Sequence, residues 1–318
     1  MRNSRIDSSS PIYVAGHNGL VGSAIVRQLE KKGYRNIVTA TRSEVDLLNQ
    51  TSVNTFLAKT KPDYIYVAAA KVGGIYANST FPATFLYENL MIECNLINGA
   101  YLAGVNNLLF LGSSCIYPRE CSQPMKESYL LTGELEPTNE PYAIAKIAGI
   151  KLCESYNKQY GTRYVSAMPT NLFGINDNFN LENSHVLPAM IRKAHEAKLK
   201  GENALPLWGS GSPLREFLYV DDMADACLFL MENGVEEGLF NVGVGKDISI
   251  KELALLVCNV VGFSGRLEFD PSKPDGTPRK LMNVDRMTTL GWQAKTSLRQ
   301  GIENTYEWFL RNQHVFRN

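Results

Sequence analysis

The chain has 318 residues, 44% hydrophobic and 20% charged, which suits one large α/β unit or two coupled domains. Its 32 basic residues cancel its 32 acidic ones, so no overall field attracts nucleic acid or an anionic membrane. No stretch approaches the roughly 18 to 20 apolar residues of a membrane span, and residues 1–10 lack a secretion signal's apolar region. We therefore expect a cytoplasmic protein with a disordered tail over residues 1–10.

The cysteines predict reduced thiols and no metal site, because they include no CxxC pair and no zinc-like spacing. Most lie among apolar residues with helical periodicity, where a thiol is usually a small core side chain. These are Cys94, Cys153, Cys227 and Cys258. The sequons at Asn49 and Asn78 are expected to stay unmodified in a cytosolic chain.

Strands and helices are predicted to alternate over the first half of the chain. The apolar run Pro11–Ala15 leads into GHNGLVG and an amphipathic segment that ends at Gly33. Further strands are expected at Asn36–Ala40, Tyr64–Ala70, Asn107–Ser113 and Tyr164–Met168, with helices at Leu86–Ala103 and Tyr142–Tyr160. This alternation predicts an α/β fold with a doubly wound parallel-sheet Rossmann domain.

The pattern changes after Pro169, where a loop-rich stretch precedes a basic helix at Ala189–Lys200. Leu218–Leu230 is expected to return to the sheet layer, Gly238–Val242 to add a strand and Ile250–Val261 to form a helix. We predict two interwoven domains. Residues 11–170 and about 217–245 would bind a dinucleotide, and about 171–216 and 246–318 would form a smaller substrate domain.

Gly16, Gly19 and Gly22 form G-x-x-G-x-x-G between a predicted strand and a predicted helix. Such glycines permit a tight turn, a close approach to a pyrophosphate and close strand–helix packing, and the helix N-terminus favours anions. This spacing resembles the extended short-chain dehydrogenases/reductases. The predicted cofactor contacts also include Leu20, Val21, Lys146, Pro169, Asn171 and Leu172.

Arg42 favours NADPH as the cofactor. An NAD enzyme places an acid about twenty residues beyond the last glycine, whereas this chain has Arg42 there. A cation suits the 2′-phosphate of NADP, although a solvated surface arginine would look the same. Asp46 could serve the adenine end or be a turn residue.

A carbonyl/alcohol redox site is predicted from three residues in order. Tyr142 and Lys146 form Y-x-x-x-K on a predicted helix, where the i, i+4 spacing places both on one face. A nearby ammonium favours the phenolate form of a tyrosine. Ser113 follows the NLLFLG strand, at the carboxyl end that faces the ligand crevice of a Rossmann sheet.

Cys115 and His185 suggest a second chemistry, because a thiol and an imidazole can act as base and acid near neutral pH. A packed loop cysteine and a helix-entry histidine are the structural alternatives. His17 is expected to be a glycine-loop residue, and His195 and His314 to be surface helix residues.

Several motifs together resemble the GDP-fucose synthase family, also called GDP-4-keto-6-deoxy-mannose 3,5-epimerase/4-reductase. They are GHNGLVGSA, AAAKVGGI, LGSSCIYP, LEPTNEPYAIAKIAGIK, NDNFNLENSHVLPA, WGSGSPLREF, VDDMADA and KPDGTPRKLM. The resemblance runs from about Pro11 to the C-terminus. It implies that Tyr142 donates a proton during 4-keto reduction, assisted by Ser113 and Lys146. It also implies that Cys115 and His185 are the base and acid that invert carbons 3 and 5.

The resemblance further implies a GDP-sugar substrate and a homodimer. Lys193 and Arg215 would contact the GDP phosphates, Trp208 the guanosine end and Asp275 a polar edge of the ligand. Without the family, an ion-pair role for Arg215 and core filling by Trp208 are the simpler interpretations. Asn18 stands where many family members carry an arginine in the glycine loop, so NADPH preference depends more on Arg42.

Two rival functions remain at the level of sequence. Another sugar-nucleotide epimerase or dehydratase of the same family is one, but a dehydratase would carry a Thr/Ser-Asp-Glu set near the serine, which GSSCIYP lacks. A non-catalytic NADP-sensing regulator is the other. Such a protein typically loses the tyrosine or the lysine, and this chain keeps both.

Overall fold

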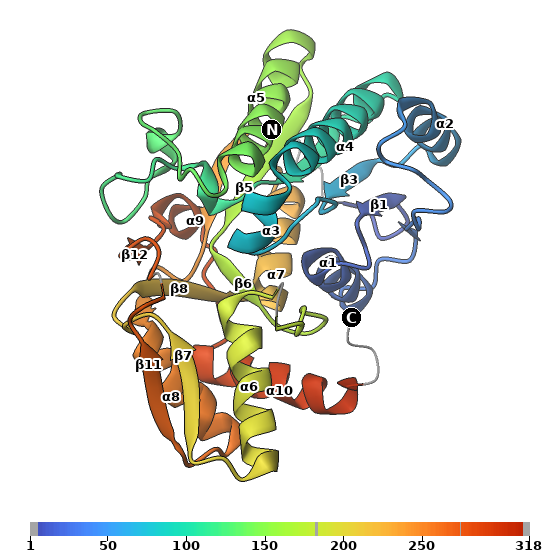
Figure 1. Ribbon diagram of the computed structural model, residues 1–318. Coiled ribbons are helices and arrows are strands. Elements are labelled where there is room, and N and C mark those ends of the chain that lie inside the picture. The colour runs from blue at the N-terminus through green and yellow to red at the C-terminus, as the bar shows by residue number, and fades with distance from the viewer. Residues whose placement is uncertain (1–5, 182–183, 274, 314–318) are drawn as a thin grey trace.

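The larger unit is a six-stranded parallel sheet with strand order β2-β1-β3-β4-β5-β9 (Figure 1). The computed structural model describes residues 6–181, 184–273 and 275–313. The strands are β1 (Ile12–Ala15), β2 (Ile37–Val38), β3 (Tyr64–Val67), β4 (Asn107–Leu111), β5 (Arg163–Pro169) and β9 (Gly238–Val242). The predicted doubly wound fold is confirmed, because helices cover both faces of this sheet.

Each face of the sheet has its own core, and alternate residues of one strand supply both. Ile12 and Val14 of β1 pack with α1 (Leu20–Lys31) and α7 (Val220–Glu232). Tyr13 and Ala15 face the opposite side, where α2 (Gln50–Thr60), α4 (Pro82–Leu102) and α5 (Glu140–Tyr160) lie. A short helix, α3 (Ile75–Thr80), precedes α4. The two-residue side-chain period of a buried parallel strand explains why β1 is apolar throughout.

The smaller unit is built around β8 (Leu214–Tyr219), which pairs with β6 (Asn171–Phe173), β10 (Asp247–Ser249) and β12 (Arg279–Lys280). A separate pair, β7 (Ala204–Trp208) and β11 (Arg266–Asp270), lies beside α6 (Val186–Lys200) and α8 (Ile250–Val261) in the lower half of Figure 1. The core of this unit also receives α10 (Leu298–Arg311).

The domain boundaries differ from those expected at two places. β8 alternates between the two units, with Phe217 and Tyr219 in the smaller core and Leu218 in the larger one. The chain also returns to the larger unit after β12, where α9 (Asp285–Thr289) brings Met287 and then Trp292 into the larger core. A single sequence pattern could not show this return, because a short helix between loops has too little periodicity.

The prediction of a disordered tail is wrong for residues 6–10. Ile6 is buried in the larger core, and the Arg35 backbone N–H donates to the Ser8 carbonyl oxygen at 3.1 Å. Residues 1–5 and His314 lie outside the described residues. Within the described part, no helix is long and apolar enough to cross a membrane.

Two side-chain predictions are also wrong. Cys94 is exposed, whereas Cys153, Cys227 and Cys258 are buried as expected. His195 is buried rather than on the surface, because α10 covers it and Tyr306 Oη lies 3.0 Å from its Nδ1. Both errors have the same cause, since which face of a helix is covered depends on a neighbour distant in sequence.

Glu216 of β8 ties the two units together. Its fully buried carboxylate accepts hydrogen bonds from the backbone N–H groups of Val244 at 2.6 Å, Gly245 at 2.7 Å and Met282 at 2.9 Å. Val244 and Gly245 follow the last strand of the large sheet, and Met282 follows β12. One side chain of β8 therefore holds two other segments at the junction.

Replacing Glu216 with alanine should strongly destabilise the protein, because three buried N–H donors lose their acceptor. A buried donor without a partner costs about 1–3 kcal/mol, so the loss should be roughly 3 kcal/mol or more in the free energy of unfolding, measured in urea. Glu268→Ala is the control, because in the described part of the chain Glu268 pairs only with Arg266 at the surface, and the change should cost about 1 kcal/mol or less. Equal losses for the two variants would contradict this role.

Candidate active site

The predicted cofactor and redox residues that follow β1, β4 and β5 lie at the carboxyl ends of central strands. β1 has β2 on one side and β3 on the other. The chain passes from β1 to β2 in one direction across the sheet and then crosses back to β3, so the strand order reverses at β1. Such a switch point opens a crevice beyond the strand ends, where open α/β sheets bind ligands. In Figure 1 these strand ends lie at the level where the two units meet, and α5 and α6 both begin near them.

The glycine loop after β1 leaves no room for side chains. Gly16 has a φ of +84°, and a Cβ there would lie 2.7 Å from the backbone of Ala69. A Cβ on Gly22 would lie 2.1 Å from the Gly16 carbonyl oxygen. The loop is therefore packed against both β3 and the first turn of α1, with Gly19 as the N-cap. Leu20 and Val21 begin the helix, whose N-terminal N–H groups are suited to an anion.

Asn176, in the loop after β6, forms hydrogen bonds to the glycine loop. Its side-chain amide donates to the Asn18 carbonyl oxygen at 3.0 Å and to Ser23 Oγ at 3.3 Å. Sequence reasoning missed this contact, because it joins residues more than 150 positions apart. The position that departs from the family pattern, Asn18, is thus held through its backbone.

Arg42 and Asp46 lie in different surroundings beyond β2. Arg42 is exposed, and no hydrogen bond or ion pair joins it to the described part of the chain. Asp46 accepts a hydrogen bond from the Leu48 backbone N–H at 3.0 Å, which fits its interpretation as a turn residue.

The predicted contacts at the nicotinamide end lie at the end of β5 and in β6. Pro169 ends β5, and the Asn171 amide donates to the Glu216 carbonyl oxygen at 2.7 Å. Leu172 packs against the larger core.

Ser113 and Cys115 lie directly beyond β4. Ser113 caps a short 3₁₀ turn over Ser114–Ile116, and its Oγ accepts from the Cys115 backbone N–H at 3.4 Å. Burial raises the pKa of the Cys115 thiol, while the Ser113 hydrogen bond and the nearby charges of Lys280 and Lys146 act in the opposite direction. The thiol is thus buried but surrounded by groups that stabilise its anion.

Tyr142 and Lys146 lie on the first turns of α5, which packs against this 3₁₀ turn. The Lys146 ammonium lies 5.8 Å from the centre of the Tyr142 ring and 4.7 Å from that of Phe110. Burial raises the pKa of the Tyr142 phenol well above its usual value, and negative charge on Cys115 and Glu93 raises it further. The structure therefore brings Ser113, Cys115, Tyr142 and Lys146 into one cluster.

His185 is the N-cap of α6 and lies in the smaller unit. The side chain is open to solvent, yet enough protein surrounds it to lower the pKa of its imidazole. No hydrogen bond joins His185 to Cys115 among the described residues, so the apposition of the two groups remains a prediction.

The predicted substrate residues form two pairs. The Lys193 ammonium lies 5.9 Å from the ring centre of Trp208, and Lys273 lies 5.7 Å from it. Trp208 is 68% exposed, which excludes core filling. Asp275 accepts from the Ser210 backbone N–H and hydroxyl, both at 2.7 Å. Burial lowers the pKa of Arg215, and the charge of Asp275 opposes that shift.

Sequence reasoning missed two charged residues of the cluster, Lys280 and Glu93. Lys280 comes from β12, and burial lowers the pKa of its ammonium while the charge of Cys115 raises it. Lys280 lies within the motif KPDGTPRKLM, one of those that carry the family resemblance, so the sequence did mark its segment. Glu93 lies on α4 and pairs with Lys146 at 2.9 Å. A lone acid in the apolar stretch NLMIECNLI was its only signal in the sequence.

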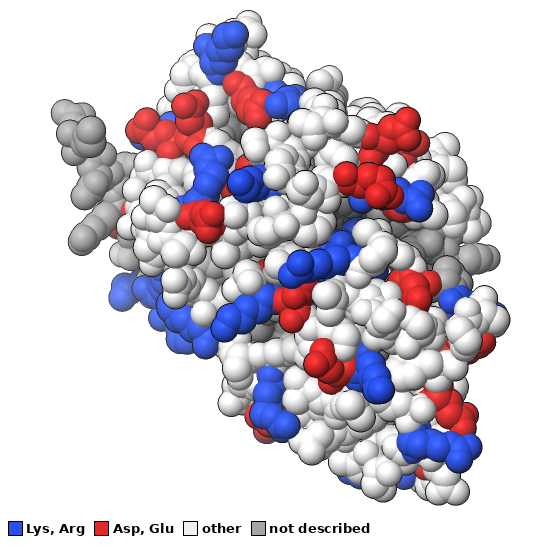
Figure 2. Space-filling view, turned by 90° about the vertical axis from the view of Figure 1, so that its left-hand side faces the viewer, with Lys and Arg blue, Asp and Glu red and all other residues white. Residues whose placement is uncertain are grey.

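Charge on the surface is mixed rather than one-sided. Figure 2 shows Lys and Arg interspersed with Asp and Glu over the face it presents, with basic side chains also beside a shadowed hollow across its middle. This fits the neutral balance of the sequence.

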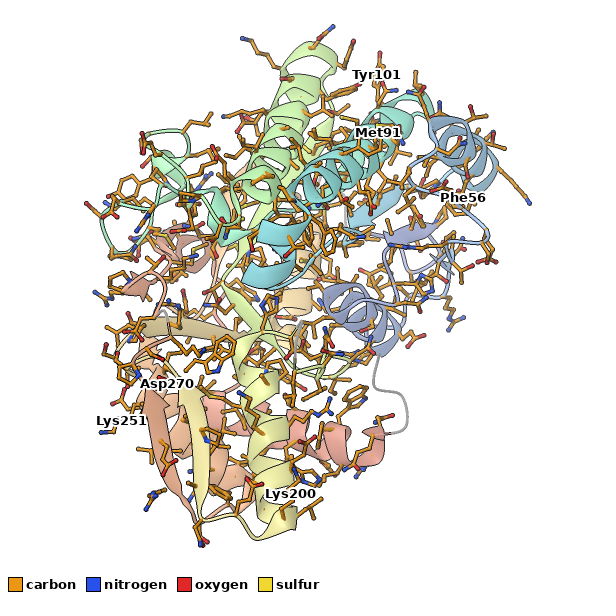
Figure 3. All side chains as sticks on the ribbon, in the orientation of Figure 1. Phe56, Met91, Tyr101, Lys200, Lys251 and Asp270 are labelled. Carbon is orange, nitrogen blue, oxygen red and sulfur yellow. The ribbon has the colours of Figure 1, made fainter. Side chains whose placement is uncertain are left out.

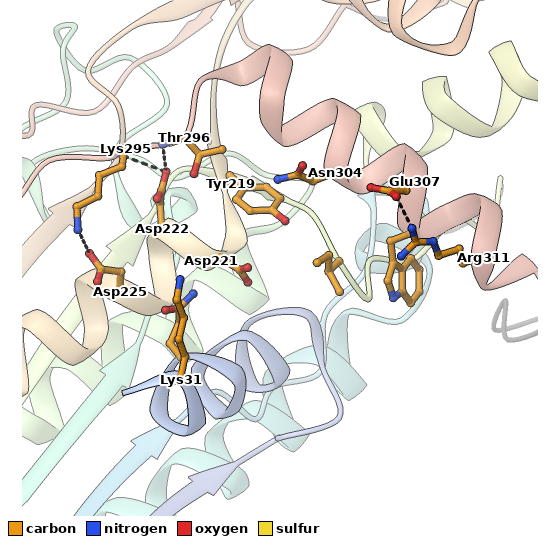
Figure 4. A pocket seen from close by; sticks show the side chains of 13 residues that line it. Lys31, Tyr219, Asp221, Asp222, Asp225, Lys295, Thr296, Asn304, Glu307 and Arg311 are labelled. Carbon is orange, nitrogen blue, oxygen red and sulfur yellow. Dashed lines mark hydrogen bonds and ion pairs between the residues drawn. The ribbon is translucent and has the colours of Figure 1, made fainter. Parts of the chain in front are cut away.

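A separate cavity of about 540 Å³ contains none of the predicted site residues. It lies between α1, α7 and α10 and is lined by Asp221, Asp222 and Asp225 among others (Figure 4). These acids already have partners: Asp222 accepts from the Thr296 backbone N–H at 2.8 Å, and Asp225 pairs with Lys295 at 3.2 Å. We therefore interpret the cavity as a gap in the packing between helices of the two units, not as a ligand site.

Comparison with known proteins decides the family. Residues 12–243 match the model of the NAD dependent epimerase/dehydratase family. The chain belongs to this family. It is 58% identical to a putative GDP-L-fucose synthase of Arabidopsis thaliana over 309 residues, which are 96% of this chain and 94% of that protein. It is 56% identical to the GDP-L-fucose synthase of Escherichia coli K12 over 319 residues, covering 98% and 99% of the two chains.

A solved structure of the epimerase/dehydratase family supports the same placement. The NADP-bound GDP-L-fucose synthetase of Naegleria fowleri superposes with a TM-score of 0.91 at 29% identity, covering 99% of this chain and 98% of that one. The predicted Rossmann fold and the resemblance to GDP-fucose synthases are thereby confirmed. The family binds a nicotinamide dinucleotide, and this relative binds NADP.

Lys280→Ala should slow alkylation of Cys115 by iodoacetamide, because the thiolate reacts and Lys280 stabilises it. Without that cation the pKa of the thiol rises further, so the labelling rate should fall at every pH below it. Peptide mapping must separate Cys115 from Cys121, whose pKa Lys280 also lowers. Lys273→Ala, beside Trp208, is the matched control and should leave the rate unchanged. An unchanged rate in Lys280→Ala would contradict this electrostatic contact.

Proposed function

We propose that this chain is a bifunctional enzyme that converts GDP-4-keto-6-deoxy-D-mannose to GDP-L-fucose, by 3,5-epimerisation followed by NADPH-dependent 4-keto reduction. The observation that carries the proposal is Cys115, a buried thiol placed beside the Tyr142–Lys146 pair. A plain reductase needs the tyrosine and the lysine but not the thiol. The full-length identity of 56–58% with GDP-L-fucose synthases supports the same conclusion.

Epimerisation uses the acidity that the ketone at carbon 4 gives to the protons on carbons 3 and 5. Cys115 as thiolate would remove each proton, and His185 would return one on the opposite face with inverted configuration. The enolate formed between these steps needs donors directed at its oxygen. Tyr142 and Ser113 would supply these hydrogen bonds.

Reduction then uses the same carbon. Bound NADPH would supply the hydride that carbon 4 receives. Tyr142 would donate its proton to the carbonyl oxygen and later regain one from solvent, and its raised pKa keeps it protonated at neutral pH. Lys146 would hold the nicotinamide ribose and Ser113 the keto oxygen.

The residues present fit a dinucleotide. The spaces that a Cβ at Gly16 or Gly22 would need are filled by backbone, so that the loop can approach a pyrophosphate closely. Leu20 and Val21 would offer helix N-terminal N–H groups, and Pro169, Asn171 and Leu172 would border the nicotinamide end. The exposed guanidinium of Arg42 would take the 2′-phosphate of NADPH.

The smaller unit would bind the GDP group. Lys193 and Arg215 carry the positive charge for its phosphates, and the exposed ring of Trp208 offers a surface for guanosine. Asp275, held by Ser210 near Arg215, would contact a polar edge of the ligand. These roles rest on the resemblance together with the pairing of these residues.

We also propose a homodimer in which α4 and α5 of each subunit meet. Large apolar side chains are exposed on both helices, among them Tyr87 and Leu102 of α4 and Ile144 and Tyr160 of α5. Tyr101, at the outer end of α4 in Figure 3, stacks on Tyr160 with ring centres 4.2 Å apart. An apolar surface on two packed helices suits a second copy of the same helix pair.

Arg42→Ala should weaken NADPH far more than NADH. A charge-assisted hydrogen bond contributes about 1.5–3 kcal/mol, so NADPH affinity should fall roughly ten- to hundredfold. Fluorescence titration with both cofactors measures this. Arg35→Ala is a control, because Arg35 precedes β2 and lies outside the proposed site. Equal losses for NADPH and NADH would remove Arg42 from the site.

The two half-reactions should separate in deuterated water. Cys115→Ala should block deuterium entry at carbons 3 and 5, and any residual NADPH oxidation should give an unepimerised 6-deoxy sugar. Tyr142→Phe should instead slow NADPH oxidation by about 10²–10⁴ while some exchange persists. Mass spectrometry and NMR of the products measure both. If Cys115→Ala exchanges deuterium like the parent, the thiol is not the base and only a keto-sugar reductase remains.

A further inference from the structure

The ion pair between Glu93 and Lys146 is the most deeply buried in the described structure. The Lys146 ammonium lies 2.9 Å from Glu93 Oε1, and the side chains are 2% and 1% exposed. Glu93 Oε2 has no hydrogen-bond partner in the described part of the chain. Removing two charges from water costs desolvation free energy that their mutual attraction often fails to offset. A buried ion pair is therefore weak evidence for stability, and this one calls for another explanation.

The packing of α4 against α5 leaves space for this carboxylate. Glu93 is on α4 and Lys146 on α5, and the two helices run along each other (Figure 1). Gly149, one turn beyond Lys146, faces the pair: a Cβ there would lie 2.8 Å from Glu93 Oε2 and 2.4 Å from the Phe110 ring. The helix interface is therefore shaped around the acid.

The charged and titratable groups around Tyr142 come from three elements. Lys146 lies on its own helix, Cys115 in the turn after β4, and Glu93 on α4. Lys280 of β12 faces Cys115 from the smaller unit, and Cys94 and Cys153 lie near Glu93. Among them Glu93 is the one carboxylate that reaches the described Tyr142–Lys146 pair.

An unpaired ammonium next to a phenol favours the phenolate, which is the form a dehydrogenase or 4-epimerase needs to remove a proton. A reductase needs the opposite form, because its tyrosine must give a proton to the carbonyl oxygen. A carboxylate that pairs with the lysine cancels most of the ammonium's charge. The tyrosine then stays a phenol at neutral pH.

We propose that Glu93 is a positioning residue that acts through Lys146: it holds the ammonium in place and offsets its charge, so that Tyr142 remains protonated as a proton donor. The inference rests on the proposed function for the direction of the reaction. Its electrostatic part, the protonation of Tyr142, can be tested without substrate.

The kinetic test compares pH profiles of NADPH oxidation. In Glu93→Gln, an amide of equal size replaces the carboxylate and leaves the charge of Lys146 uncompensated. The pH above which reduction declines should move down by at least about one unit, so that one unit above the new limit the rate falls about five- to tenfold relative to the parent. Glu93→Asp should restore much of the parent profile. An unchanged limit in Glu93→Gln overturns the proposal.

Glu88→Gln is the matched control. Glu88 lies on the same helix, and its carboxylate pairs with Lys71 at 3.3 Å rather than with Lys146. It should leave the pH limit where it is. A shift as large as that of Glu93→Gln would show a general effect of helix charge and would also overturn the proposal.

A second measurement does not depend on the folding of the Glu93 variants. The tyrosinate absorbance of the parent, minus that of Tyr142→Phe, reports the ionisation of Tyr142 alone. It should rise only above the usual phenol value of about 10. Ionisation clearly below that value overturns the proposal. Because no substrate is present, this result stands even if the parent fails to form GDP-fucose, which would refute the proposed function instead.

Discussion

The Glu216 carboxylate is the contact on which the geometry of the site depends. It lies at the junction of the two units and accepts hydrogen bonds from three backbone N–H groups that belong to two separate loops. A Cβ on Gly243 would lie 2.3 Å from Glu216 Oε1, so the loop after β9 has no room for a side chain there. Through Met282 the same carboxylate fixes the strand that carries Lys280. Glu216 therefore helps to position the strand from which Lys280 approaches Cys115.

A second set of constraints comes from burial. Cys115 and Tyr142 both have a pKa raised by burial, and both lie near Lys146. In water the two groups would be weakly coupled, but in a low-dielectric site each charge affects the others strongly. One cluster can then support two proposed chemistries: Lys280 favours the thiolate form of Cys115, and Glu93 favours the phenol form of Tyr142. Because Lys280 acts mainly on Cys115 and Glu93 on Tyr142, one cluster can hold a base and an acid together.

The proposed division of labour between the units follows from their architecture. The parallel sheet is covered on both faces, so its ligands can only enter beyond the strand ends. The smaller unit covers that edge and supplies His185, Lys193, Trp208 and Arg215 from its own elements. Because β8 contributes side chains to both cores, the units cannot shift freely against each other. Rigid support of this kind suits the proposed reaction, which moves protons at carbons 3 and 5 and a hydride to carbon 4.

The sequence by itself determined the fold class, most strands and helices, and the set of Ser113, Tyr142 and Lys146. These features are local: a glycine fingerprint between a strand and a helix, a strand end and an i, i+4 spacing each involve a few consecutive residues. The resemblance to a known family favoured catalytic roles for Cys115 and His185, which spacing alone left open, and added the substrate residues.

Only the tertiary structure decided the remaining features. The Glu93–Lys146 pair joins two helices, Lys280 reaches Cys115 from the far end of the chain, and Ile6 and His195 are buried by distant segments. Burial and long-range charge depend on which elements pack together, and a single sequence carries no periodic signal for such contacts. The same limit explains the return of residues 285–292 to the larger core. Local spacing thus specified the chemical groups, and packing determined their charge states.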